Sequence, residues 1–147
     1  MAYDLYAFDL FAAPRNRDDF LEWVSRAFRD QDGGPGGDAS RTTVPLRNWH
    51  RDMAKGFPGL RDPHSLDDDE ESEIQRITSY RFTQSIVQAS FHWDASSSAL
   101  YRARRGAQAF GVGLFEASGH DAAVWMISSR GRFEVIHRAD EDQLQFG

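Results

Sequence analysis

The sequence predicts a single α+β domain built on one mostly antiparallel sheet of five or six strands. The main observation is the stretch from Tyr80 to Phe115, where two strand-like segments precede a helix-like segment and another strand. A strand-like and a helix-like segment also open the chain, so the order of elements is β-α-β-β-α-β. The chain has 147 residues, of which 40% are hydrophobic, so residues 1–147 fit one domain with a sizeable core.

Residues 3–10 predict a central strand, because both of its alternating faces are nearly apolar. Pro14 and Asn16 end this strand, and Asn16 or Asp18 is placed to cap the helix that follows. We expect that helix over residues 18–28, where apolar residues recur with the helical period. Its apolar stripe consists of Phe20, Leu21, Val24, Ala27 and Phe28.

Two polar segments flank a shorter helix. Residues 31–42 are rich in glycine and predict a flexible linker, whereas residues 61–73 predict a polar, acidic loop. Between them, residues 44–57 predict a helix with Pro45 in its first turn. We place this short helix at an edge of the sheet. Its apolar residues recur every three or four positions, at Leu46, Trp49, Met53 and Phe57.

Residues 76–83 and 86–93 predict a hairpin, because apolar and polar side chains alternate on both sides of a short turn. A helix is expected over residues 94–110, with Asp94 or Ser96 as its N-terminal cap, Gly111 as its C-terminal cap and close backbone packing after it. The remaining strands are expected at 112–117, 122–128 and 133–137, followed by an acidic, frayed tail at 139–147.

The order of these elements predicts a ferredoxin-like layout. In this layout the two main helices, over residues 18–28 and 94–110, pack on one face of the sheet. The short helix at 44–57 then lies beside them at the edge.

The composition narrows the classes of function. A net charge of −6 argues against general affinity for nucleic acid, because binding to phosphates depends on Lys and Arg. The chain contains no cysteine, which excludes disulfides and thiolate chemistry. Its apolar runs fall far short of the roughly 20 residues that cross a bilayer, and no secretory pattern opens it. We therefore expect a cytoplasmic protein that does not enter the membrane.

The densest charge in the chain is an acidic run that includes Asp67, Asp68, Asp69, Glu70 and Glu71. Three interpretations are open for it: a solvated loop, an acidic surface that binds a basic partner, or a site for a divalent metal. The metal interpretation is the weakest, because the glycine that a calcium-binding loop of the EF-hand type requires at its turn is absent.

Among the four tryptophans, Trp49 is the candidate for a surface anchor. The other three fall mostly on predicted apolar faces, where core packing is the default. Trp49 instead lies on a short helix between two polar segments, so we consider it a contact for a partner.

Evidence for catalysis in the sequence is weak. The five histidines are scattered without metal-binding spacing, and no serine lies in a nucleophile elbow. His92 and Asp94 follow a strand and precede a helix, a place where sites occur, although a strand residue and a helix cap explain them as well. A pair of carboxylates for acid–base catalysis requires that the strands bring two acidic residues together, and the candidates are Glu116, Asp4 and Asp9. The sequence predicts no enzyme, no cofactor and no bound metal.

Three features of the chain resemble small, uncharacterised bacterial α+β proteins. These features are the opening YDLYAFDL, the acidic stretch before the hairpin, and the GVGLF strand that follows the second main helix. The resemblance covers residues 3–10 and 65–117. Some of these proteins are encoded beside polymorphic toxins and look like immunity proteins, so the resemblance implies a protein-binding function.

We therefore expect an immunity protein that neutralises a basic bacterial toxin by occlusion, acting as a monomer or homodimer. An acidic inhibitor can be steered to a basic toxin by its charge. The candidate contacts are the acidic run, Asp67 to Glu71, together with Trp49. The alternative is a small ligand-binding protein or enzyme of ferredoxin-like fold, with a site near His92, Asp94 and Glu116. A third hypothesis is a homo-oligomer that pairs through an exposed sheet edge.

Overall fold

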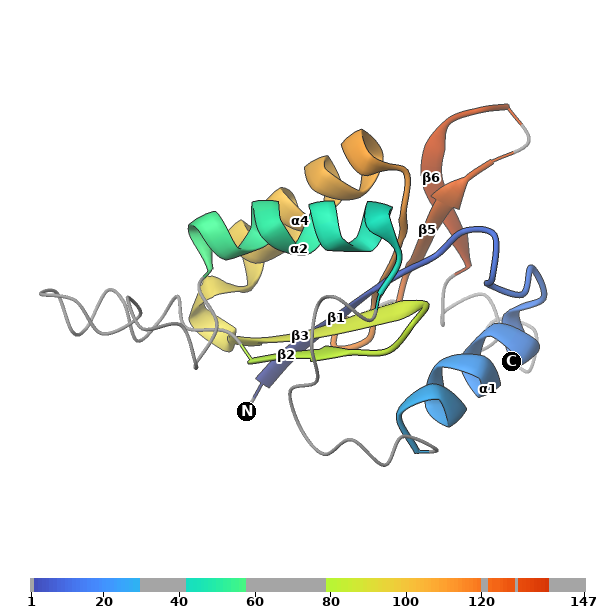
Figure 1. Cartoon of the computed structure of the whole chain (residues 1–147), viewed down its shortest axis with the longest axis horizontal. Coiled ribbons are helices and arrows are strands. Elements are labelled where there is room, and N and C mark those ends of the chain that lie inside the picture. The colour runs from blue at the N-terminus through green and yellow to red at the C-terminus, as the bar shows by residue number, and fades with distance from the viewer. Residues whose placement is uncertain (1, 30–41, 58–78, 120–121, 129, 138–147) are drawn as a thin grey trace, which may run out of the picture.

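Six strands form one antiparallel sheet that carries helices on both of its faces (Figure 1). The structure is a computed structural model, and it describes residues 2–29, 42–57, 79–119, 122–128 and 130–137. The elements in these ranges are β1 (Ala2–Phe8), α1 (Arg17–Arg29), α2 (Val44–Gly56), β2 (Ser79–Phe82), β3 (Ile86–His92), the 3-10 turn η2 (Trp93–Ala95), α4 (Ser96–Phe110), β4 (Gly113–Glu116), β5 (Val124–Ile127) and β6 (Phe133–His137).

The strand β1 lies inside the sheet, whose order is β2-β3-β1-β4-β5-β6. It pairs antiparallel with β3 on one side and with β4 on the other, so that Leu5 is opposite both Ala89 and Glu116. The strands β2 and β3 form the predicted hairpin, and β5 and β6 extend the sheet beyond β4. The predicted α+β class is confirmed, and the topology is that of a single ferredoxin-like domain extended by a hairpin.

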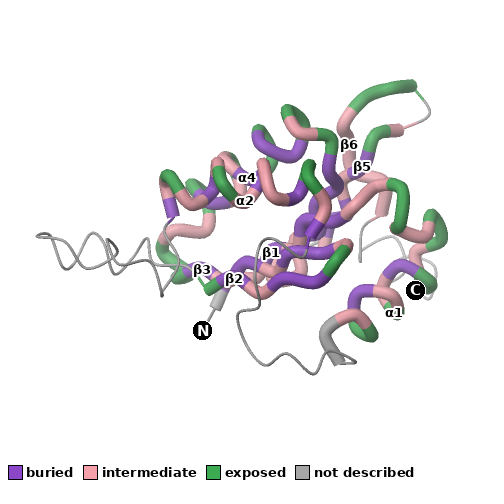
Figure 2. Tube along the Cα trace, in the orientation of Figure 1, coloured by how far each residue is buried: buried purple, intermediate pink, exposed green. Residues whose placement is uncertain are grey.

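The alternation of side chains along β1 divides the core into two clusters. Leu5 and Ala7 are fully buried on the face that α2 and α4 cover, whereas Phe8 is fully buried on the opposite face. There Phe8 packs with Phe20 and Val24 of α1. The predicted central strand with two apolar faces is therefore confirmed, and buried residues concentrate along the middle of the sheet (Figure 2).

Two helices share one face of the sheet, as expected, but they are α2 and α4 rather than α1 and α4. Figure 1 shows α2 and α4 side by side over one face and α1 on the other. The short helix is thus not an edge element, because it buries Leu46, Trp49 and Met53 against the sheet and α4. None of the three helices in the described ranges is long and apolar enough to cross a bilayer.

The spacing of small residues explains why α2 packs beside α4. The buried stripe of α4 consists only of Ala and Gly, which lets another helix approach closely. The stripe of α2 supplies large side chains, and its Trp49 fills the space above this narrow surface. The two stripes are complementary in volume, as close-packed interiors require. The residues in the α4 stripe are Ala99, Ala103, Gly106 and Ala107.

The two glycines after α4 have the roles that the sequence predicts. Gly111 ends the helix in the left-handed conformation, with φ of 75°, and its N–H donates to the carbonyl of Ala107 at 2.9 Å. Gly113 is opposite Phe8 across the β1–β4 pair, and the Phe8 ring lies directly over it. A Cβ atom at position 113 would be 2.2 Å from this ring.

The substitution Gly113→Ala should destabilise the fold by at least about 1–3 kcal/mol, because the added methyl group would displace the fully buried Phe8 ring. The free energy of unfolding in urea measures this loss. Gly111→Ala is the comparison: it meets no atom within 4 Å and should cost about 1 kcal/mol through its backbone conformation alone. Equal losses in the two variants would contradict a steric role for Gly113.

Candidate functional site

The acidic run that the sequence singles out, Asp67, Asp68, Asp69, Glu70 and Glu71, lies outside the described residues. Its role therefore stays a prediction. The run belongs to a chain whose charges are unevenly distributed. The described residues contain 13 Lys and Arg against 9 Asp and Glu, whereas the whole chain contains 17 Lys and Arg against 23 Asp and Glu. The acidic balance of the protein thus resides in the segments outside the described fold.

Trp49 is a core residue, which corrects its assignment as a surface anchor. Its side chain is fully buried, and its indole Nε1 donates to the carbonyl oxygen of Ala103 in α4 at 3.1 Å. The sequence pattern of α2 fits a buried position equally well, since Trp49 lies on the same stripe as Leu46 and Met53. The exposed aromatic side chains near α4 are instead Trp93, which is 45% exposed, and Tyr101, which is 64% exposed.

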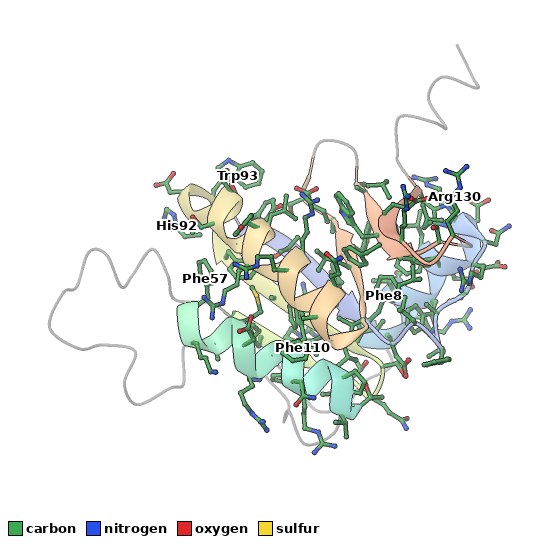
Figure 3. The ribbon with its side chains drawn as sticks, turned by 90° about the horizontal axis from the view of Figure 1, so that it is seen from above. Phe8, Phe57, His92, Trp93, Phe110 and Arg130 are labelled. Carbon is green, nitrogen blue, oxygen red and sulfur yellow. The ribbon has the colours of Figure 1, made fainter. Side chains whose placement is uncertain are left out.

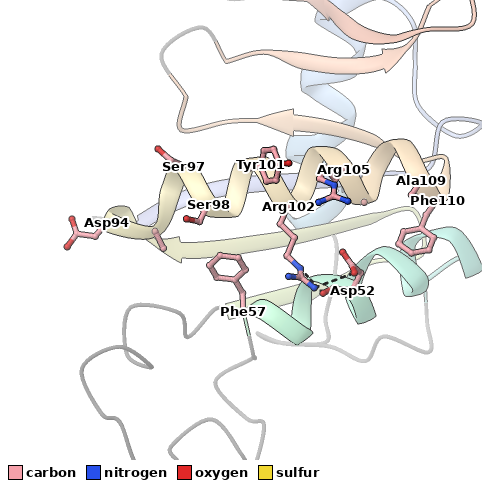
Figure 4. Close-up of a pocket in the computed structure, with 13 residues that line it drawn as sticks. Asp52, Phe57, Asp94, Ser97, Ser98, Tyr101, Arg102, Arg105, Ala109 and Phe110 are labelled. Atoms are coloured by element: carbon pink, nitrogen blue, oxygen red, sulfur yellow. Dashed lines mark hydrogen bonds and ion pairs between the residues drawn. The ribbon is translucent and has the colours of Figure 1, made fainter.

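A groove of about 950 Å³ follows the seam between α2 and α4, and it is the strongest candidate for a functional site in the described fold (Figure 4). Its lining combines small, charged and aromatic side chains from both helices. Phe57 lies near the end of α2 and the start of α4, and Phe110 lies at the other end of α4 (Figure 3). The size is within the range of ligand-binding sites, about 300–1,000 Å³.

Small residues create this groove by leaving the facing sides of both helices bare. Gly56 lines it from α2, and Ser98, Gly106 and Ala109 line it from α4. The two helices are held together beneath it, where the ring of Trp49 is so close to Gly106 that a Cβ there would lie 3.1 Å from the indole Cδ1. The groove is therefore a consequence of close helix packing below a surface of small side chains.

Arg102 crosses the groove and is anchored to α2. Its Nε donates to the backbone carbonyl of Asp52 at 3.0 Å, and its Nη2 pairs with Asp52 Oδ1 at 3.4 Å. The guanidinium lies against Gly56, where an added Cβ would be only 2.9 Å from Nη1. Both side chains are about one-third exposed, so the ion pair contributes little to stability and mainly fixes the orientation of the guanidinium.

The two helices that form the groove carry an excess of positive charge. Their only acidic residue is Asp52, which is already paired with Arg102. The guanidinium of Arg105 lies 5.7 Å from the centre of the Tyr101 ring, and both residues line the groove. This helical layer is thus a basic surface on an acidic protein, and it favours anionic groups. Its basic residues are Arg47, Arg51, Lys55, Arg102, Arg104 and Arg105.

Sequence reasoning missed that Arg102 and Arg105 of α4 line a groove beside a second helix. A signal for the groove exists in the spacing. Ser98, Arg102, Arg105 and Ala109 recur at four, three and four positions, which places them on one side of α4. The spacing alone does not reveal which helix lies beside them, because that depends on the pairing of α2 with α4.

Within the alternative site, His92 and Asp94 contact each other, whereas Glu116 is engaged by Tyr3. Asp94 lines one end of the groove, and its backbone N–H donates to Nδ1 of His92 at 3.3 Å. Glu116 accepts a hydrogen bond from the hydroxyl of Tyr3 at 2.5 Å. Burial raises the pKa of Tyr3 far above its usual value, and the hydrogen bond to Glu116 raises it further. Tyr3 thus stays a neutral donor that engages Glu116.

The carboxylates of Asp4 and Glu116 do not form an acid–base pair, because they lie on opposite faces of the sheet. Glu116 shares a face with Leu5, its partner in the β1–β4 register, and Asp4 precedes Leu5 on the strand. Asp4 instead accepts a hydrogen bond from the hydroxyl of Ser90 at 2.6 Å. Asp9 accepts one from the backbone N–H of Phe11 and so stabilises a turn.

The described part of the chain contains no candidate metal-binding site. The residues described there contain no group of three or more His, Asp or Glu side chains placed to hold an ion. Comparison of the chain with protein-family models, with curated proteins and with solved structures found no match.

His50 of α2 is a titratable residue packed between aromatic rings. Its imidazole lies edge-on to Tyr80 and Phe82, with ring centres 4.6 Å and 4.8 Å away. Burial lowers the pKa of His50 below its ordinary value, and the neighbouring Arg51 lowers it further. The folded protein therefore keeps His50 neutral at pH values where the unfolded chain binds a proton.

The free energy of unfolding should fall as the pH decreases from about 7 to about 5, because His50 takes up a proton more readily in the unfolded chain. This stabilisation is fully present above the pKa that His50 has in the unfolded chain. It is lost as the pH falls towards the lower pKa that His50 has in the folded protein. Urea unfolding of His50→Phe should show a smaller dependence on pH over this range. An identical pH dependence in this variant and the parent would contradict the prediction.

The substitution Trp49→Ala should lower the free energy of unfolding by about 3–5 kcal/mol, because it empties the space above α4 and removes the hydrogen bond to Ala103. Trp93→Ala is the matched control, since Trp93 is half-exposed and contacts Tyr3 only edge-on. Trp93→Ala should lower the free energy of unfolding by only about 1 kcal/mol. Similar losses for the two tryptophans in urea unfolding would contradict the core assignment of Trp49.

Proposed function

We propose that this chain is a protein-binding domain of the immunity type, which neutralises a bacterial toxin by covering its active surface. The observation that carries the proposal is the separation of charge along the chain. Of the 23 acidic residues, 14 lie in segments outside the described fold, and five of them form the consecutive run Asp67–Glu71. A concentrated acidic segment in a chain whose described residues are basic on balance can steer a basic patch of a partner to that segment.

The surface of the helical layer supports protein binding as well. Trp93 is half-exposed and Tyr101 is largely exposed, and Arg102 and Arg105 line the same groove as Tyr101. Tryptophan, tyrosine and arginine are the residue types that dominate binding energy in protein interfaces. In this proposal the protein acts in the cytoplasm as a monomer or homodimer. Its partner is a basic toxin, and neither nucleic acid nor a membrane is involved.

The second candidate is a protein that binds a small ligand. The observation that favours it is the groove itself, whose volume of about 950 Å³ suits a small molecule and whose Arg102 is held in place by Asp52. A metabolite that binds there should raise the midpoint of thermal unfolding in proportion to its affinity. Such a shift, abolished by a substitution of Arg102, would favour this candidate over the immunity function.

The test of the immunity proposal is to neutralise the acidic run by changing Asp67, Asp68 and Asp69 to Asn and Glu70 and Glu71 to Gln. A tagged full chain first captures its partner from the source cells at low and moderate salt. The captured complex should contain one stoichiometric basic protein. The variant should bind this protein about 10–100-fold more weakly and with a smaller salt dependence, because screened charges supply much of the attraction.

The matched control neutralises three exposed acidic residues on α1, with Asp18→Asn, Asp19→Asn and Glu22→Gln. It removes charge from the far side of the sheet and should leave the affinity within about threefold. Unchanged affinity and unchanged salt dependence in the run variant would remove the acidic run from the interface. The absence of a captured partner at either salt concentration would contradict the immunity function itself.

A further inference from the structure

We infer that the β5–β6 hairpin opens as a unit while the rest of the fold stays intact, and that Arg104 of α4 holds it closed. Such an opening goes beyond the proposed function and involves no toxin or other partner. Three features of the described residues support it: the position of the hairpin in the fold, its small number of buried side chains, and its contact with α4.

The hairpin is an addition to a fold that is complete without it. The elements from β1 to β4 already form a four-stranded sheet, β2-β3-β1-β4, with helices on both faces (Figure 1). The strand β5 pairs with β4 at only two positions, Leu114–Trp125 and Phe115–Val124. By comparison, β1 and β3 pair over all seven residues of both strands. Few backbone hydrogen bonds therefore have to break for the hairpin to separate from β4.

The hairpin also has few fully buried side chains. All five residues of β6 are half-buried, although Phe133, Val135 and Ile136 are apolar. In β5 only Val124 and Met126 are buried, and they pack in the cluster that α1 covers. The strands β1 and β3 each bury four core side chains. Because apolar burial dominates the resistance to local opening, the hairpin should open at a lower free energy than β1 or β3.

On its other face the hairpin meets α4 through a cation–π contact. The hairpin lies to one side of α2 and α4 rather than beneath them (Figures 1 and 3). The guanidinium of Arg104 lies over the indole ring of Trp125, 4.1 Å from its centre. Trp125 in turn stacks on Phe133 of β6, with ring centres 5.9 Å apart. One exposed arginine of α4 thus contacts a ring pair that spans both strands of the hairpin.

The indole N–H of Trp125 favours the open hairpin. Its Nε1 is buried and has no hydrogen-bond partner among the described residues. A buried donor without a partner destabilises the closed arrangement, because water satisfies the same N–H once the hairpin opens. The cation–π contact of Arg104 acts in the opposite direction on the same ring. The balance between the open and the closed hairpin therefore depends on position 104.

Opening of the hairpin uncovers the outer edge of β4 without releasing α1. Phe20 of α1 packs against Phe8 of β1 and Phe115 of β4. These contacts belong to the four-stranded sheet and persist when β5 and β6 separate from it. The open state thus keeps both helical layers and exposes an unpaired strand edge, which is the part of a sheet most prone to pair with another strand.

Native-state hydrogen exchange of the full chain, followed residue by residue in NMR spectra, tests this opening. The hydrogen-bonded amides of β5 and β6 should have protection factors at least about 10-fold lower than those of β1 and β3. Their exchange should also depend little on low concentrations of urea, because a local opening exposes much less surface than global unfolding.

Variants at position 104 test the role of the arginine. Arg104→Ala should lower the protection factors of the hairpin by a further factor of about 2–5 and leave those of β1 and β3 unchanged. Arg104→Lys keeps a positive charge near the ring and should show a smaller change. The matched control is Arg105→Ala, because the guanidinium of Arg105 lies 5.7 Å from the Tyr101 ring. This control should leave the protection factors of the hairpin unchanged.

Equal protection factors and equal urea dependence in the hairpin and in β1 would show that the hairpin opens only when the whole domain unfolds. An Arg104→Ala variant that lowers protection by the same factor in β1, β3 and the hairpin, or does not lower it at all, would remove the role of Arg104. Because no partner protein takes part, neither result bears on the immunity function.

Discussion

The contact between Trp49 and α4 is the interaction on which the helical face of this domain depends. Because the buried stripe of α4 contains only Ala and Gly, the indole of Trp49 can lie against the helix and donate to the carbonyl of Ala103. A larger side chain at Gly106 would hold the two helices apart. The close approach in turn brings Asp52 within reach of Arg102, so the groove and its fixed guanidinium both follow from the same packing.

The sequence predicted the sheet well because its signals are local. The period-two alternation of β3 and the mixed apolar faces of β1 follow directly from burial on one or both sides. The C-terminal end of α4 was equally readable, since Gly111 adopts the left-handed conformation that a helix terminus favours, whereas the predicted cap at Asp94 or Ser96 was wrong, because the N-cap is Ala95. Each of these features depends on a few consecutive residues, and none requires knowledge of what packs against them.

The placement of helices was harder to predict because α1 and α2 are both amphipathic and both 13 residues long. Period alone gives no information about which face of the sheet a helix covers. The volume of the side chains shows which face a helix covers. The large Trp49 and Met53 of α2 complement the small stripe of α4. In contrast, Phe20 of α1 packs among the rings of Phe8 and Phe115. The misplacement of α2 at an edge also made Trp49 look like a surface residue.

The same limitation explains why the groove was missed and the acidic run was not. A run of consecutive carboxylates is visible in any window of the sequence, whereas the groove combines Asp52 and Gly56 with residues about 50 positions later. The two features carry opposite charge, with the excess of acid outside the described fold and six basic residues on the helical layer.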